Sequence, residues 1–124
     1  MPTKPSRKLD VFPNPKPGRR YVITHECPEY TAICPVTGQP DFGTIVITYT
    51  PDKLCVELKS LKLYIWSFRS EGHYFEKATN LILDDLVKVT KPHEMTVTGH
   101  FNVRGGITST VEAAYVKGRK RTRK

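Results

Sequence analysis

The sequence predicts an α+β fold, an antiparallel four-stranded sheet that carries two helices on one face. Residues 44–50 and 95–103 place apolar side chains at every second position, which is the period of a half-buried strand. Residues 61–89, which lie between them, follow the longer period of helices. The resulting order of two strands, two helices and two strands (ββααββ) suits a single layer of helices on one sheet.

The strands before the helices are expected in the first half of the chain. Residues 21–24 predict a first strand or its beginning. Residues 26–43 contain three prolines and two glycines, and this composition predicts a long, stiff loop. Residues 44–50 are β-branched and aromatic. After a turn at Pro51, residues 54–57 are expected to return as a second strand.

The second half predicts both helices and the last two strands. Apolar residues at i, i+3, i+4 and i+7 indicate the first helix, namely Leu61, Tyr64, Ile65 and Phe68. Gly72 is expected to end it, and a second helix follows over about 74–89. Residues 95–103 and 107–115 then alternate again and pair as two strands.

The basic side chains concentrate at the two ends of the chain. The formal net charge is +8, yet residues 21–116 hold 8 basic and 11 acidic side chains. We therefore divide the chain into a basic, proline-rich arm over 1–19, a domain over 20–116 and a basic tail over 117–124. Both ends are expected to lack regular structure, and they offer the only predicted contact with nucleic acid, through phosphates.

Cysteine content indicates the compartment. The count of three is odd, and no apolar run approaches the length of a signal peptide core or a membrane span. These features predict a reduced, cytoplasmic protein without a membrane partner. Cys27, Cys34 and Cys55 lack the close pairing that structural zinc requires, so we expect no metal.

The segment that begins at Cys34 carries the clearest chemical signal. Pro35 and Pro40 stiffen the backbone after this thiol, which suits a positioned nucleophile. Asp41 follows seven residues later, and a curled loop would return it to the sulfur. A carboxyl group there could protonate a nitrogen that gains negative charge as the thiol adds. From the residues alone, a small buried cysteine beside a turn aspartate is an equally good interpretation.

Two weaker signals lie on the helices. Lys59, Ser60 and Lys62 stand at a helix start, where backbone N–H groups favour an anion such as a phosphate, although an ordinary solvated first turn is the commoner case. There is no G-x-G-x-x-G motif, so a dinucleotide would bind outside a Rossmann unit. Glu76 could accept from the N–H groups of a guanine-like ring, although a solvated helix acid is the commoner case.

Taken together, these strings resemble the NADPH-dependent 7-cyano-7-deazaguanine reductases of queuosine biosynthesis, over about residues 20–116. The resemblance rests on residues 34–42 (CPVTGQPDF), 57–64 (ELKSLKLY, the hallmark of that family), 67–69 (SFR), Glu76 and 104–106 (RGG). It implies the tunnelling fold, in which subunits assemble into rings with active sites between them. It also implies reduction of a nitrile to a primary amine, 7-aminomethyl-7-deazaguanine, with two NADPH.

The resemblance assigns roles by position. Cys34 would be the nucleophile that forms a covalent thioimide, and Asp41 would be the proton donor. The substrate-binding positions would be Val56, Glu57, Leu58, Phe75 and Glu76. The NADPH-binding positions would be Lys59, Ser60, Lys62, Arg104, Gly105 and Gly106.

One position departs from the family pattern. Many relatives have a histidine immediately before the substrate glutamate, and this chain has Phe75 there, with His73 two residues earlier. A phenylalanine can stack on a base but cannot transfer a proton.

Two other functions compete with the reductase. A tunnelling-fold amidinotransferase that adds ammonia to the same nitrile in tRNA would need Cys34 and Asp41, but not the lysines of 59–62. A non-catalytic RNA-binding module would depend on the basic ends. For a reductase, we expect turnover to survive the removal of residues 1–19 and 117–124.

Overall fold

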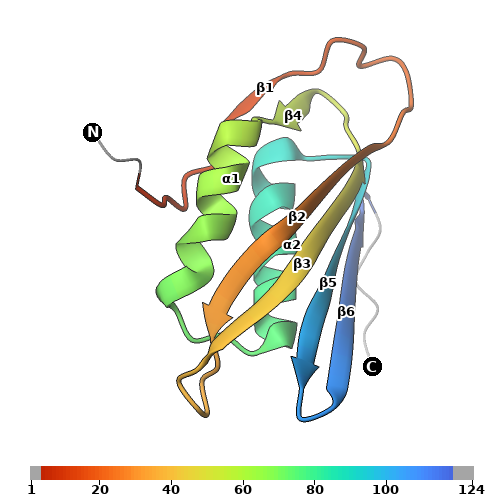
Figure 1. The fold of residues 1–124 in the computed structure, drawn as a ribbon. Coiled ribbons are helices and arrows are strands. Elements are labelled where there is room, and N and C mark those ends of the chain that lie inside the picture. The colour runs from red at the N-terminus through yellow and green to blue at the C-terminus, as the bar shows by residue number, and fades with distance from the viewer. Residues whose placement is uncertain (1–3, 119–124) are drawn as a thin grey trace.

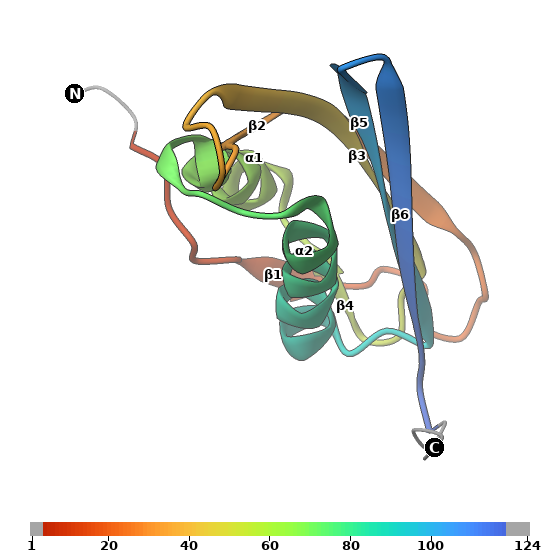
Figure 2. The ribbon, with the colours of Figure 1, turned by 90° about the horizontal axis from the view of Figure 1, so that it is seen from below.

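Four antiparallel strands form one sheet in the order β2-β3-β5-β6, and both helices cover the same face of it (Figures 1 and 2). The computed structural model describes residues 4–118, without the side chains of residues 103 and 104. The sheet strands are β2 (Ile23–Ile33), β3 (Pro40–Thr50), β5 (Glu94–Arg104) and β6 (Ile107–Val116). The helices are α1 (Leu58–Trp66) and α2 (Phe75–Thr90), with a short 3-10 helix, η1 (Ser67–Ser70), after α1. This arrangement confirms the predicted α+β class, both helices and the final pair of strands. The first helix ends earlier than the expected stop at Gly72, because α1 ends at Trp66 and the chain continues as η1.

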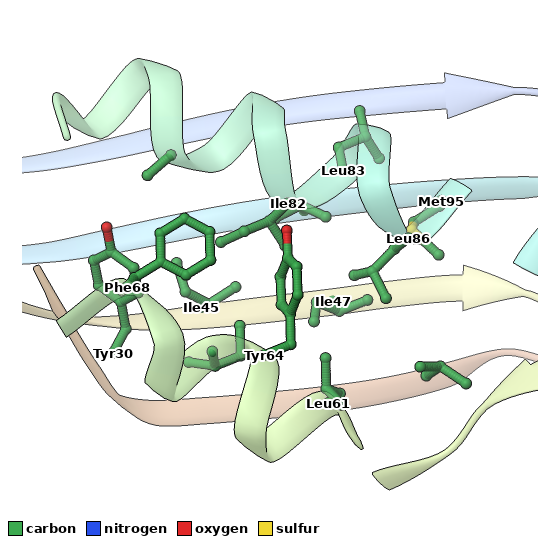
Figure 3. Packing of buried hydrophobic residues seen from close by; sticks show 14 of the residues in the cluster. Tyr30, Ile45, Ile47, Leu61, Tyr64, Phe68, Ile82, Leu83, Leu86 and Met95 are labelled. Carbon is green, nitrogen blue, oxygen red and sulfur yellow. The ribbon is translucent and has the colours of Figure 1, made fainter. Parts of the chain in front are cut away.

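The core lies between the sheet and the two helices. Alternate residues of β3 and β5 point toward the helices, and they meet the apolar stripes of α1 and α2 (Figure 3). The fully buried contributors include Ile45, Ile47, Val97, Tyr64, Ile82 and Leu86. The hydroxyl of Tyr64 donates to Asp85 on α2 at 2.6 Å, so the one polar atom of this side chain also joins the helices.

The predicted loop over 26–43 is wrong for most of its length. β2 and β3 run through it and leave only residues 34–39 as the turn between them. Pro28 is tolerated because β2 is an edge strand and because the ladder is irregular between Cys27 and Tyr30. Pro40 is the first residue of β3, where proline is also accepted.

The strand predicted over 54–57 exists but does not join the main sheet. It is β4 (Leu54–Val56), and it pairs with β1 (Val11–Pro13), with Phe12 opposite Cys55. The two strands of the main sheet that precede the helices are therefore β2 and β3, which pair with each other. The expectation that residues 1–19 lack regular structure is wrong at β1. This strand forms by pairing with β4, which is distant in the sequence, and local periodicity cannot reveal such a pairing.

The N-terminal arm lies against the domain on either side of β1. The amide of Ser6 donates to the carbonyl oxygen of Leu63 at 3.2 Å, and that of Asn14 donates to the carbonyl oxygen of Lys53 at 2.9 Å. In the C-terminal tail, Lys117 forms an ion pair with Asp52, and residues 119–124 lie outside the described residues. Within residues 4–118, neither helix combines the length and apolar character that crossing a membrane demands.

Candidate active site

Cys34 opens the turn between β2 and β3, and both of its backbone groups are fixed there. Its amide donates to the carbonyl oxygen of Gln39 at 2.8 Å, and its carbonyl oxygen accepts from the amide of Gly38 at 2.9 Å. Gly38 has a φ of 76°, a left-handed conformation in which a side chain would be strained. The thiol is half-buried. The turn therefore holds the sulfur in a fixed place without enclosing it.

The turn also favours the reactive form of this thiol. The pKa of Cys34 is lowered from its ordinary value because the Thr37 hydroxyl donates to the sulfur, as do the backbone N–H groups of Thr37 and Val36. Partial burial and the nearby Asp41 carboxylate act weakly in the opposite sense. Thr37 belongs to the string that suggested the site, but no pattern in that string indicated a role for its hydroxyl.

Asp41 stands on the same face of the hairpin as Cys34. In the ladder Asp41 lies opposite Ala32, and the bond between Cys34 and Gln39 continues the same register. Asp41 is two residues beyond Gln39, so it is the diagonal neighbour of Cys34, at roughly 7 Å between backbones. It is only 6% exposed. The hairpin thus makes the two residues diagonal neighbours through strand pairing, and not through the curled loop that the sequence suggested.

Phe75 and Glu76 reach the same end of the sheet from the start of α2. The ring of Phe75 stacks on Phe101 of β5, with 4.0 Å between centroids and 5° between planes. Phe101 lies opposite Gly43, two residues along β3 from Asp41. Glu76 is exposed in the first turn of α2, which suits an acceptor for a ligand. The Phe75 ring and Asp41 therefore lie near the same end of β3, and Glu76 is the next residue along α2 from Phe75.

The other predicted substrate positions lie at the start of α1. Glu57 caps this helix, because its carboxylate accepts from the amides of Lys59 and Ser60 at 2.8 Å each. These two bonds lower the pKa of Glu57. Val56 is buried, and its amide donates to the Tyr49 hydroxyl at 3.0 Å. The start of α1 is therefore well ordered by its own contacts.

The three predicted cofactor positions on α1 differ in accessibility. Lys59 and Lys62 are both exposed, and both line a groove of about 900 Å³ between α1 and β2. Ser60 is buried, its hydroxyl donates to the carbonyl oxygen of Glu57 at 2.8 Å, and it accepts from the amide of Asp10 at 2.9 Å. The lysines thus present charge to the groove, whereas the Ser60 hydroxyl already bonds the N-terminal arm to α1.

The remaining predicted cofactor positions form the hairpin between β5 and β6. Gly105 and Gly106 have φ values of 63° and 83°, so this turn requires residues without side chains. Arg104 ends β5, and its side chain lies outside the described part of the structure.

One chain holds its predicted site residues in two separate groups. Val56 bonds to Tyr49, and Tyr49 is eight residues along β3 from Asp41, which amounts to roughly 25 Å of strand. In Figure 1 the turn between β2 and β3 accordingly lies at the end of the sheet opposite to the start of α1. A single base-sized ligand cannot contact Asp41 and Glu57 of the same copy.

Comparison with solved structures places the fold. A crystal structure of the archaeosine synthase QueF-Like in the apo form superposes with a TM-score of 0.69, covering 82% of this chain and 96% of that one. The two sequences are 17% identical, so this likeness concerns the tunnelling fold alone.

Sequence comparison identifies the family. The family model described as QueF-like protein matches residues 40–120. The NADPH-dependent 7-cyano-7-deazaguanine reductase of Thiobacillus denitrificans is 59% identical over 117 residues, 94% of this chain and 84% of that protein. The reductase of the same name from Anaeromyxobacter sp. strain Fw109-5 is 59% identical over 115 residues, 93% of this chain and 94% of that protein. This chain therefore belongs to the family of NADPH-dependent 7-cyano-7-deazaguanine reductases.

Proposed function

We propose that this enzyme reduces the nitrile of 7-cyano-7-deazaguanine to 7-aminomethyl-7-deazaguanine, with NADPH as the reductant and Cys34 as the covalent nucleophile. Its relatives at 59% identity carry the names of such reductases. The observation that supports the covalent step is a half-buried thiol with a lowered pKa, on the same hairpin face as a buried carboxyl group.

Cys34 and Asp41 have separate roles in the first chemical step. The Cys34 thiolate adds to the nitrile carbon, and the nitrogen takes a proton from Asp41 in its carboxylic acid form, which gives a thioimide and the Asp41 carboxylate. The Thr37 hydroxyl and the turn N–H groups stabilise the sulfur anion, both before it attacks and after the carbon–sulfur bond breaks. Overall, two hydrides and two protons convert the nitrile to the amine.

The substrate base would lie between the aromatic and acidic residues of the site. The Phe75 ring has one face on Phe101, so a base would stack on its other face or its edge. Glu76 and Glu57 can each accept from the N–H groups of a guanine-like ring.

The groove between α1 and β2 fits the cofactor. On the α1 side, Lys59 and Lys62 present positive charge that is complementary to the phosphates of a dinucleotide, whereas Glu26 and Glu29 line the β2 side. NADPH bound there supplies the hydrides. The family names favour the reductase over the amidinotransferase, because they specify NADPH and a reduction.

A complete site requires a second copy of the chain. Asp41 and Glu57 stand roughly 25 Å apart along one subunit, so a neighbouring copy must bring its α1 to the Cys34 turn. Each of these two groups of site residues lies beside an exposed apolar side chain. Phe42, next to Asp41, is 52% exposed, and Leu58, next to Glu57, is 60% exposed. The edge strands β2 and β6 are available for pairing between copies, so we propose a ring with sites at its interfaces. We also propose a cytoplasmic location, which the three free cysteines support.

Intact mass spectrometry with the nitrile base and no NADPH tests the covalent step. The native protein should gain the mass of one base per chain, and Cys34→Ala should gain none. Cys27→Ala is the matched control and should keep the adduct, because burial raises the pKa of the Cys27 thiol to about 11. An adduct of normal yield on Cys34→Ala would overturn the assignment. Oxidation of NADPH, followed by absorbance with the free base, then separates reductase from amidinotransferase.

A further inference from the structure

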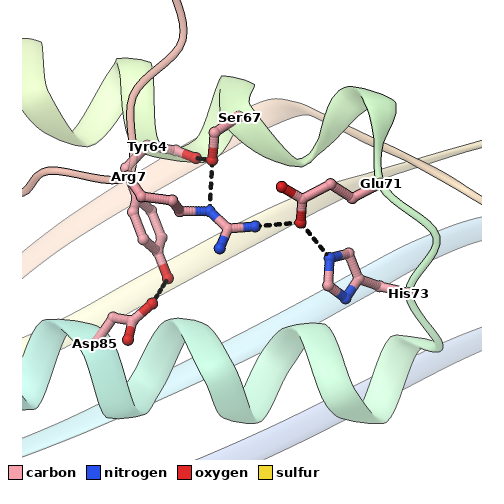
Figure 4. A network of polar contacts seen from close by, with 6 residues as sticks. All are labelled: Arg7, Tyr64, Ser67, Glu71, His73 and Asp85. Atoms are coloured by element: carbon pink, nitrogen blue, oxygen red, sulfur yellow. Dashed lines mark hydrogen bonds and ion pairs between the residues drawn. The ribbon is translucent and has the colours of Figure 1, made fainter.

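Arg7, in the N-terminal arm, reaches the segment that follows α1 (Figure 4). Its Nε donates to the Ser67 hydroxyl at 2.7 Å, and its Nη2 donates to the Glu71 carboxylate at 2.5 Å. The guanidinium lies over the Phe68 ring, 4.1 Å from its centroid. Three kinds of contact therefore fix one side chain, which separates Arg7 from the solvated charges of an ordinary basic tail.

Glu71 links Arg7 to His73. The same carboxylate oxygen that accepts from Arg7 lies 2.7 Å from Nε2 of His73. These partners, His73 first, lower the pKa of Glu71, so the carboxylate is charged at neutral pH. The His73 ring also packs against Phe68, with 5.2 Å between centroids. Residues 71–73 are thus held in place by side chains at both of their ends.

The same short segment pairs with the backbone next to the nucleophile. The amide of Ile33 donates to the carbonyl oxygen of Glu71 at 2.8 Å, and the amide of His73 donates to the carbonyl oxygen of Ile33 at 3.2 Å. Between them, Gly72 forms a parallel bridge with Ile33. A Cβ on Gly72 would lie 3.8 Å from Pro35. Residues 71–73 therefore contact the chain on both sides of Cys34.

We propose that Arg7 is a positioning residue for Cys34, because it fixes residues 71–73 and these hold the backbone that flanks the nucleophile. β2 is an edge strand, so without residues 71–73 the backbone groups of Ile33 would lose these two bonds. The sulfur would then leave its place diagonal to Asp41.

The electrostatics of Tyr30 agree with this link. Burial raises the pKa of this residue most, and the charges of Asp41, Arg7 and Glu71 also shift it. Tyr30 is therefore within electrostatic range of both Asp41 and the Arg7–Glu71 pair. This inference rests on the proposed covalent step. Because Arg7 lies within residues 1–19, we now expect the removal of this arm to slow turnover, contrary to the expectation from the sequence.

The rate of adduct formation with the nitrile base, without NADPH, tests the proposal. We would measure it against base concentration for the native chain, Arg7→Ala and Arg7→Lys, which yields a limiting rate and an apparent dissociation constant. Arg7→Ala should lower the limiting rate roughly ten- to a hundredfold, with little change in the dissociation constant, because the base still binds but the sulfur is misplaced. Arg7→Lys should recover part of the rate, since an ammonium group can still pair with Glu71.

Lys8→Ala is the matched control and should react as the native chain does, because Lys8 is 81% exposed and its ion pair with Asp10 is long, at 3.9 Å.

Circular dichroism at the assay temperature shows whether each variant is folded. If Arg7→Ala does not fold, Glu71→Gln serves instead, because it weakens the ion pair and keeps the backbone bond to Ile33; its limiting rate should fall about tenfold. An unchanged limiting rate in a folded variant, or an effect on the dissociation constant alone, would overturn the proposal. A native chain without an adduct would instead overturn the covalent step itself.

Discussion

Phe75 and Phe101 stack with their planes 5° apart and their centroids 4.0 Å apart, although one begins α2 and the other lies on β5. A near-parallel stack places one complete face of Phe75 against the protein. The residue that departs from the usual family pattern is therefore also a structural contact between helix and sheet. Only the other face and the edge of the Phe75 ring are therefore available to a substrate.

Replacing Phe75 with alanine should affect both stability and binding. We expect the free energy of unfolding to fall by about 2 kcal/mol, because the ring is half-buried and loses its stacking partner. The apparent dissociation constant of the nitrile base should rise as well. Urea denaturation and the adduct assay measure the two effects. Tyr74→Ala is the control, since this neighbour is 59% exposed and makes no side-chain cap bond; equal losses in both variants would contradict a specific role for Phe75.

Gly99 is expected to tolerate no side chain. A Cβ there would lie 2.5 Å from the Phe101 ring and 3.0 Å from the Thr79 hydroxyl. The Phe101 ring cannot simply move aside, because Phe75 stacks on it. Gly99→Ala should therefore lower the free energy of unfolding by roughly 1–3 kcal/mol. Gly18→Ala, which has nothing within 4 Å, should leave the melting temperature unchanged, and equal melting temperatures for both variants would refute the steric argument.

The pH dependence of Cys34 should report on Thr37. The Thr37 hydroxyl is the largest cause of the lowered pKa of Cys34, and the thiolate is the reactive form. Thr37→Val should raise this pKa, so the alkylation rate should rise at a higher pH than in the native chain. Thr37→Ser keeps a hydroxyl and should retain the native profile. Iodoacetamide labelling followed by peptide mass spectrometry measures the profile, and superimposable curves for all three proteins would exclude the Thr37 contribution.

Mixed assemblies should reveal a site shared between copies. Cys34→Ala and Glu57→Gln are each expected to be inactive when assembled alone. After equal mixing and reassembly, about one quarter of the interfaces should combine an intact Cys34 with an intact Glu57 from the other copy. NADPH oxidation should recover to about that fraction of the native rate. No recovery, in mixtures shown to contain both variants, would mean that each site is built within one copy.

The spacing of apolar residues was sufficient to predict the helices and strands that bury one face. The alternation over 95–103 matches β5 closely, and the stripe that begins at Leu61 locates α1, although its last member, Phe68, lies in η1. Proline content misled the interpretation of 26–43, because it cannot show that β2 lies at an edge where Pro28 is tolerated. The pairing of β1 with β4 was missed, because β1 shows no strand signal of its own and the strand predicted over 54–57 was assigned to the main sheet.

The catalytic hairpin was only partly predictable. The spacing of Cys34 and Asp41 indicated that they meet, but strand register, which decides the face of each side chain, became visible only in the structure. Arg7 was missed because it stands 64 residues from Glu71 and resembles any other charge in a basic arm.

The register of the β2–β3 hairpin also limits insertions and deletions between Cys34 and Asp41. Reverse turns are usually where chains accept extra residues. Here the buried Ile45 and Ile47 fix β3, so Asp41 keeps its place whatever happens upstream. A codon added between Cys34 and Asp41 would have to be accommodated within residues 34–39, and this would carry the sulfur away from its acid while the domain still folded. Natural variants of this enzyme should therefore conserve the number of residues between these two positions more strictly than the residues themselves.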